Sequence, residues 1–67
     1  MPMIDPFLHS PGLQRRLADH LRTKRRARKL SRARLAQLST VPAATIKRFE
    51  LSGEISLRQF CLLWECL

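Results

Sequence analysis

Hydrophobic residues recur at helical spacing over most of the chain, which predicts an all-α fold. The first stripe is a set of leucines four residues apart, Leu13, Leu17 and Leu21. Ser10-Pro11 stands directly before it, and this pair is typical of a helix cap and first turn. Residues 1–9 have no such periodicity and hold two of the four prolines. We therefore expect a flexible N-terminal arm at 1–9, followed by one domain at 10–67.

The stretch from Leu30 to Gly53 predicts two short helices joined by a tight turn. Ser31 can cap the first of them, with Leu30 and Leu35 placed around it as a hydrophobic staple. The apolar side of this helix consists of Leu35, Ala36 and Leu38. The second helix is expected at Pro42–Leu51, because the missing N–H of a proline has no partner in a first turn anyway. Its buried face is formed by Ile46 and Phe49, three residues apart.

A last helix is predicted after Ser56, which forms a capping box with Gln59 and has Ile55 and Phe60 around it as a staple. This helix is more apolar than one buried face requires. We expect the core to take Leu57, Phe60 and either Leu63 or Trp64. The surplus would be exposed on a monomer and is assigned to a dimer or partner surface: Leu62, Trp64, Cys66 and Leu67. A second copy of the chain is the favoured occupant, and a further C-terminal helix is the alternative.

Length and charge limit the classes of function. The 67 residues make one small domain, and 13 Lys and Arg against 5 Asp and Glu leave a net charge of +8. This balance is typical of a polyanion binder, and basic charge alone would also suit RNA or an acidic membrane. The basic residues Lys24, Arg25 and Arg28 continue the first leucine stripe, and their methylenes can cover a core while the charged ends reach solvent.

No residue pattern indicates a membrane span, a metal site or catalysis. No apolar run approaches the roughly 20 residues of a span, and the N-terminus lacks a secretory pattern, so we expect a cytoplasmic protein. Cys61 and Cys66 are five residues apart on different faces of a predicted helix, and His9 and His20 add no zinc spacing. Paired carboxylates, a nucleophile beside a base and a glycine-rich phosphate loop are all lacking. We expect no metal, no cofactor and no enzyme.

One set of residues has a spacing that is typical of a known family: Leu30-Ser31, Leu35-Ala36, Val41, Thr45-Ile46 and Arg48-Phe49-Glu50. In this combination the chain resembles the helix-turn-helix of the phage lambda repressor and Cro family, also called the xenobiotic-response-element (XRE) family of bacterial regulators. The resemblance extends over residues 25–67. It implies a small bundle of four to five helices that binds double-stranded DNA at the nucleoid and regulates transcription, as a repressor that blocks polymerase.

The resemblance also assigns residues to contacts with DNA. It makes Pro42–Leu51 the recognition helix, whose candidates for base contact in the major groove are Ala43, Ala44, Lys47 and Arg48. Alanine offers only a methyl group to a thymine, so polar recognition of bases depends on Lys47 and Arg48. Phosphate contacts are assigned to Arg32, Arg34 and Thr45. The two arginines occupy a first helical turn, where the helix dipole disfavours cations unless an anion binds there.

Three positions complete the comparison with the family. An arginine at the place of Arg25 pairs in the family with the glutamate that closes the recognition helix, here Glu50, and fixes the angle between two helices. Thr40 stands where the family usually has a glycine in left-handed conformation, and a β-branched residue would be strained there. Pro42 replaces the usual serine or threonine cap.

The partners expected are double-stranded DNA and a second copy of the chain, because a two-fold symmetric protein matches the half-sites of a palindromic operator. One alternative is an antitoxin of the same fold, which binds a toxin through residues 1–9 and 60–67 and represses its own operon. Another is an RNA or membrane binder that uses the first helix as a basic amphipathic helix.

Overall fold

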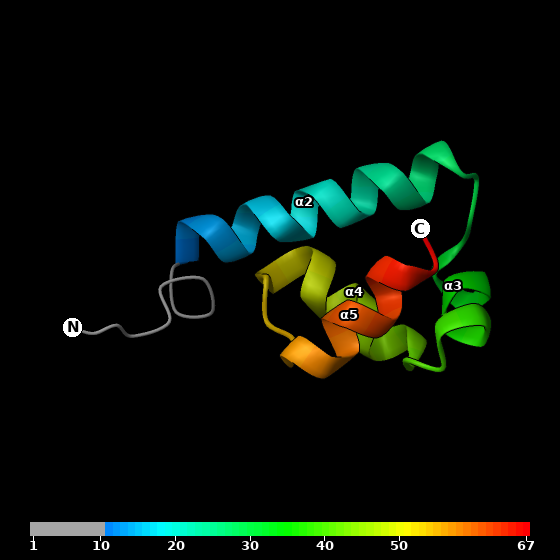
Figure 1. The fold of residues 1–67 in the computed structure, drawn as a ribbon. Helices are drawn as coiled ribbons and strands as arrows, with labels where there is room; N and C mark the ends of the chain where they lie inside the picture. The colour runs from blue at the N-terminus through cyan, green and yellow to red at the C-terminus, as the bar shows by residue number, and fades with distance from the viewer. Residues whose placement is uncertain (1–10) are drawn as a thin grey trace.

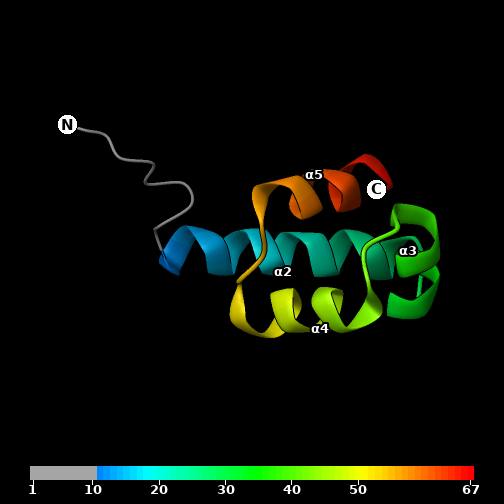
Figure 2. The ribbon, with the colours of Figure 1, turned by 90° about the horizontal axis from the view of Figure 1, so that it is seen from below.

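The computed structural model describes residues 11–67, which form four α-helices and no strand. They are α2 (Pro11–Ala27), α3 (Arg32–Ser39), α4 (Ala43–Ser52) and α5 (Leu57–Glu65). The longest helix, α2, runs the length of the molecule with the other three on one side of it (Figure 1). Seen from below, α4 and α5 lie on either side of the line of α2, and α3 closes the end where α2 finishes (Figure 2). The arm expected at 1–9 and the cap expected at Ser10 lie outside the described residues.

The core lies where the four helices meet. Its buried apolar members are Ala18, Leu21, Leu35, Val41, Ile46, Phe49 and Leu63. The prediction that Ile46 and Phe49 form the buried face of their helix is confirmed. Leu21 is also buried as predicted, whereas Leu17 is half-buried beside the core. Ala18 was not predicted, and it lets the neighbouring helices approach the backbone of α2 closely.

Two leucines are exposed, one that the sequence places on the apolar side of its helix and one that it assigns to the core. Leu38 is 47 % exposed and Leu57 is 49 % exposed. Both lie near the ends of short helices: α3 has eight residues and buries only Leu35 and Ser39, and Leu57 is the first residue of α5. A stripe at helical spacing therefore predicts burial less well at a helix end, where no neighbouring element covers the outer residue.

The surplus of apolar residues on α5 is smaller than the sequence predicts. The prediction that Leu62, Cys66 and Leu67 are exposed on a single chain is wrong, because all three are half-buried against the core. Trp64 is 37 % exposed, but its ring stacks on His20 and on Phe60, with centroids 5.7 and 5.6 Å apart. The chain itself thus covers most of this surface.

Local capping explains where the helices begin. The Ser31 hydroxyl accepts a hydrogen bond from the backbone N–H of Arg34 at 3.0 Å, and the Ser56 hydroxyl accepts one from Gln59 at 3.1 Å. Both predicted caps are therefore confirmed. Pro42 is the N-cap of α4 and lies just outside the helix, so α4 begins one residue later than predicted.

The turn between α3 and α4 has the left-handed residue that the resemblance implies. Thr40 has φ 66° and ψ 8° and is exposed. Its N–H donates to the Ala36 carbonyl oxygen at 2.9 Å, and the Ser39 hydroxyl accepts the N–H of Val41 at 3.2 Å. Local hydrogen bonds and the buried Val41 side chain hold this turn, so the strain expected of a threonine is accommodated rather than avoided.

Candidate nucleic-acid interface

The two sides of α4 differ sharply in burial and charge. Ile46, Phe49 and Glu50 are buried against the rest of the protein. The opposite side presents Lys47 and Arg48, both exposed. The remaining candidates for DNA contact on α4 differ in burial: Ala44 is exposed, and Ala43 and Thr45 are half-buried. Of the residues assigned to base contact, Lys47, Arg48 and Ala44 thus lie on the accessible surface of one helix.

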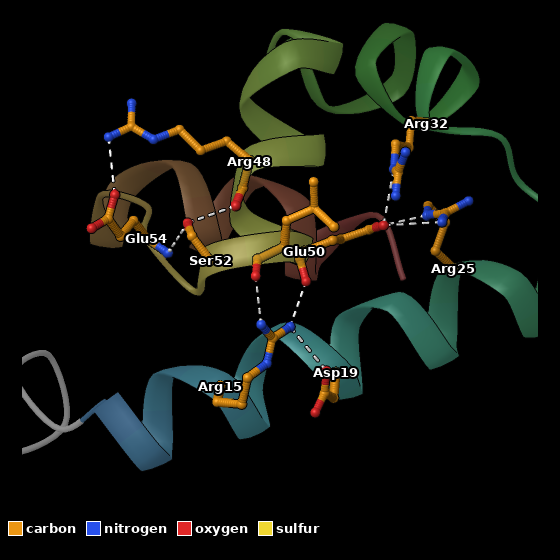
Figure 3. A network of polar contacts seen from close by, with 9 residues as sticks. Arg15, Asp19, Arg25, Arg32, Arg48, Glu50, Ser52 and Glu54 are labelled. Atoms are coloured by element: carbon orange, nitrogen blue, oxygen red, sulfur yellow. Dashed lines mark hydrogen bonds and ion pairs between the residues drawn. The ribbon is translucent and has the colours of Figure 1, made fainter.

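Glu50 lies at the centre of the contacts that hold this helix in place. Its carboxylate accepts hydrogen bonds from Arg25 at both oxygens, with Nε–Oε2 at 2.7 Å and Nη2–Oε1 at 3.1 Å (Figure 3). Arg32 donates from Nε to Oε1 at 3.0 Å. Arg25 uses Nη1 to donate to the Leu30 carbonyl oxygen at 2.8 Å. The predicted Arg25–Glu50 ion pair is thus present and joins α2 to α4, while Arg32 adds α3 to the same carboxylate.

The buried environment sets the charge state of Glu50. Its side chain is 1 % exposed. Burial alone would raise the pKa of Glu50, but the hydrogen bonds from Arg25 and Arg32, together with their positive charges, outweigh burial and lower the pKa below its usual value. Two arginines on one carboxylate leave this cluster with a net positive charge.

The two arginines assigned to phosphate contact occupy different surroundings. Arg32 has its Nε bound to Glu50 and its side chain 34 % exposed, so part of its guanidinium serves the interior. The sequence did not indicate this role. Arg34 is exposed, and its Nη1 donates to Oε1 of Gln37 at 3.0 Å. Both arginines follow Ser31 in the first turn of α3, at the end of the basic run at 24–34.

The basic run between residues 24 and 34 divides into buried and exposed members. Arg25 is buried, and the ammonium of Lys24 lies 5.3 Å from the centroid of the Trp64 ring. In both residues the charged end lies against the protein, whereas the sequence predicts that it reaches solvent. Arg28 is exposed and does not cover the core. The expectation for Arg28 was wrong because α2 ends at Ala27, one residue earlier. Arg26 and Lys29 are exposed as well.

Arg48 has an acidic neighbour that the sequence analysis did not identify. Its Nη2 lies 3.0 Å from Oε1 of Glu54, with the two side chains 71 % and 64 % exposed. The Ser52 hydroxyl donates to the Arg48 carbonyl oxygen at 2.7 Å and accepts the backbone N–H of Glu54 at 3.2 Å (Figure 3). An acid six residues after an arginine across a helix end has no helical period, so no sequence signal marked it.

Arg15 holds the C-terminal end of α4 from α2. Its guanidinium donates to the carbonyl oxygens of Glu50 and Leu51, the latter at 2.7 Å, and to Asp19 at 3.0 Å. Asp19 lies four residues after Arg15 on the same helix, so only this contact follows from helical spacing. The last turn of α4 contains no basic residue, and its carbonyl oxygens lack partners within the helix. Arg15 supplies these hydrogen bonds from α2, 35 residues away in sequence from Glu50.

The described residues hold no cluster of three or more metal-ligating side chains, and Cys61 and Cys66 are free thiols. Within residues 11–67, no helix combines the length and the hydrophobicity that crossing a membrane would need.

Comparisons with known proteins do not extend the resemblance drawn from the sequence. A scan against models of protein families, a search of curated proteins and a search of solved structures each return no match to this chain.

Proposed function

We propose that this protein binds double-stranded DNA through a helix-turn-helix formed by α3 and α4, and that it regulates transcription by occupying an operator. The observation that carries the proposal is the two-sided character of α4. Its inner side is fixed by Ile46, Phe49 and the buried Glu50 cluster, while Lys47 and Arg48 are exposed on its outer side. A rigid helix that presents cations outward is what recognition in a major groove requires.

In this proposal the exposed residues of α4 face base edges. Lys47 and Arg48 would donate to the O6 and N7 acceptors of guanine, and the methyl group of Ala44 would contact a thymine methyl. Ala43 is half-buried and would contribute less contact. Recognition through so few polar groups would depend in part on DNA shape and on the spacing of two half-sites bound by a homodimer.

Phosphates would bind beside this helix. Arg34 is exposed at the start of α3, and Thr45 is half-buried on α4. Arg32 donates one N–H to Glu50, and a guanidinium has five, so the half-exposed remainder can still serve a phosphate. The net charge of +8 would supply affinity through counterion release.

The test is selection of bound sequences from a pool of random duplexes, followed by affinity measurements over a range of salt concentrations. We expect an enriched, two-fold symmetric motif and an affinity that falls steeply with salt. Lys47→Ala and Arg48→Ala should relax the preference at individual base positions. Arg34→Ala should weaken all duplexes alike and reduce the salt slope by about 0.9.

Arg16→Ala and Arg22→Ala are matched controls, since both remove an exposed arginine from α2. If these two variants lose more affinity than the α4 variants, the basic face of α2 is the binding surface and the proposal is wrong. An affinity for duplex that does not change with salt would also contradict it.

A further inference from the structure

We propose that Glu54 is a positioning residue for Arg48 in DNA recognition, and that it makes binding selective by keeping this arginine away from phosphates. This inference rests on the proposed function and adds a determinant of specificity to it. It concerns a residue outside α4, in the segment that leads to α5.

The position of Glu54 is set by the backbone. Gly53 ends α4 in a left-handed conformation with φ 82°, and its N–H donates to the Phe49 carbonyl oxygen at 2.7 Å. A Cβ at Gly53 would lie 3.2 Å from the backbone carbon of Gln14, so α2 confines this turn. The chain therefore leaves α4 in one direction, and that direction brings residue 54 back beside the outer side of the helix.

A single hydroxyl then joins the two residues of the pair. Ser52 donates to the carbonyl oxygen of Arg48 and accepts the N–H of Glu54, at 2.7 and 3.2 Å. With both backbones fixed to Ser52, the carboxylate reaches Nη2 of Arg48 at 3.0 Å (Figure 3). The pair is thus formed on a rigid support, although both side chains are mostly exposed.

Glu54 also differs from the other carboxylates of residues 11–67. Asp19 binds Arg15 on α2, Glu50 is buried, and Glu65 is at the end of α5. Glu54 alone contacts a residue assigned to base recognition. A carboxylate at this place repels phosphates. Covering it with duplex DNA costs free energy if no cation is paired with it, because removing water strengthens the interactions of unpaired charges.

The consequence is that Arg48 retains Glu54 when DNA approaches. One of its five N–H groups is bound to the carboxylate, which leaves enough donors for the two acceptors on the guanine edge. A hollow of about 260 Å³ adjoins the pair between Thr45 and Gln59, so the protein leaves this side of the guanidinium open. Held in this way, Arg48 can bind a base edge within its reach, and its contact with a phosphate competes with the contact to Glu54.

The experiment compares Glu54→Gln with Glu65→Gln, which removes the same charge from an exposed glutamate at the end of α5. Affinity is measured for the best selected duplex and for random duplex at one salt concentration. We expect Glu54→Gln to bind random duplex about three- to tenfold more tightly, while its ratio of selected to random affinity falls by a similar factor. Glu65→Gln should change both affinities by the same small factor and leave the ratio unchanged.

A double variant tests that Glu54 acts through Arg48. Arg48→Ala removes the base preference at one position, and adding Glu54→Gln to it should not alter the preference further. Thermal unfolding is recorded for every variant, and equal melting temperatures exclude a loss of folding as the cause. If Glu54→Gln behaves like Glu65→Gln, the inference is overturned while the proposed function stands. If the wild-type protein binds no duplex, both are overturned.

Discussion

Arg25 of α2 and Glu50 of α4 are joined by two hydrogen bonds inside the protein, 25 residues apart in the sequence. The carboxylate at their centre also binds Arg32 of α3, so three of the four described helices meet at one side chain. In a domain of 67 residues the apolar core is small, and a contact of this kind accounts for much of how the helices are oriented.

We expect Arg25→Ala to destabilise the protein by about 3–5 kcal/mol, because it leaves part of a buried carboxylate without its partner. A single core of this size supplies a stability of about the same magnitude, so most molecules of the variant should be unfolded at room temperature. Circular dichroism during thermal unfolding measures this. Arg26→Ala, which truncates the exposed neighbour, should melt like the wild type. Equal melting temperatures for the two variants would show that the ion pair does not hold the fold.

The lowered pKa of Glu50 predicts a loss of stability in acid. A carboxyl group whose pKa is lower in the folded protein stabilises it at pH above the ordinary value, about 4.3, and this contribution is lost as the pH falls through the lowered pKa. Urea unfolding from neutral pH down to about pH 3 should therefore show a falling free energy of unfolding. The free energy of unfolding of Glu50→Gln, measured in a stabilising osmolyte, should be lower at neutral pH and should fall less toward pH 3. That of Glu65→Gln should fall as it does in the wild type. An unchanged slope in Glu50→Gln would assign the acid sensitivity to other groups.

Local signals were sufficient to predict much of this fold. Ser31 and Ser56 were identified as caps because an N-cap hydroxyl needs only the N–H two or three residues ahead. Ile46 and Phe49 were identified as buried because their spacing follows the helix. The Arg25–Glu50 pair came from the resemblance to a family, since nothing in the sequence itself connects two residues so far apart.

The contacts missed at Arg15 and Arg32 join segments that are distant in the sequence. Nothing in the sequence distinguishes Arg15, and Arg32 is a candidate only for phosphate contact. Yet Arg15 binds the end of α4 and Arg32 binds the carboxylate of Glu50. Which arginine reaches a buried acceptor depends on how the helices cross, and helical periodicity does not contain that information. Glu54 was missed for a related reason, because its contact with Arg48 depends on the direction of the turn at Gly53.

Gly53→Ala should lower the melting temperature. The residue has φ 82°, a conformation that costs an L-residue about 1–2 kcal/mol, and its new Cβ would lie 3.2–3.3 Å from atoms of Gln14. For a domain of this size each kcal/mol corresponds to about 4–8 °C. Gly12→Ala is the matched control: Gly12 lies in α2, and a Cβ there meets nothing within 4 Å. That variant should melt at the same or a slightly higher temperature, since alanine favours a helix. A Gly53→Ala protein as stable as Gly12→Ala would contradict the account of this turn.

Thr40→Gly should raise the melting temperature, which is unusual for the loss of a side chain. Thr40 is exposed and has φ 66°, and a β-branched residue is strained in this conformation, by about 1–2 kcal/mol. Glycine removes the strain but makes the unfolded chain more flexible, at a cost of about 0.4–1 kcal/mol. The relief of strain exceeds this cost, so we expect a net gain in stability. Calorimetry should show it as a rise of a few degrees in the melting temperature.

Thr40→Asn separates these two effects. Asparagine tolerates the left-handed conformation better than threonine does and leaves the unfolded chain less flexible than glycine does. We therefore expect it to be at least as stable as the wild type. A fall in melting temperature in both variants would mean that the hydrogen bond from the Thr40 hydroxyl to the Ser39 carbonyl oxygen stabilises the turn by more than the strain destabilises it.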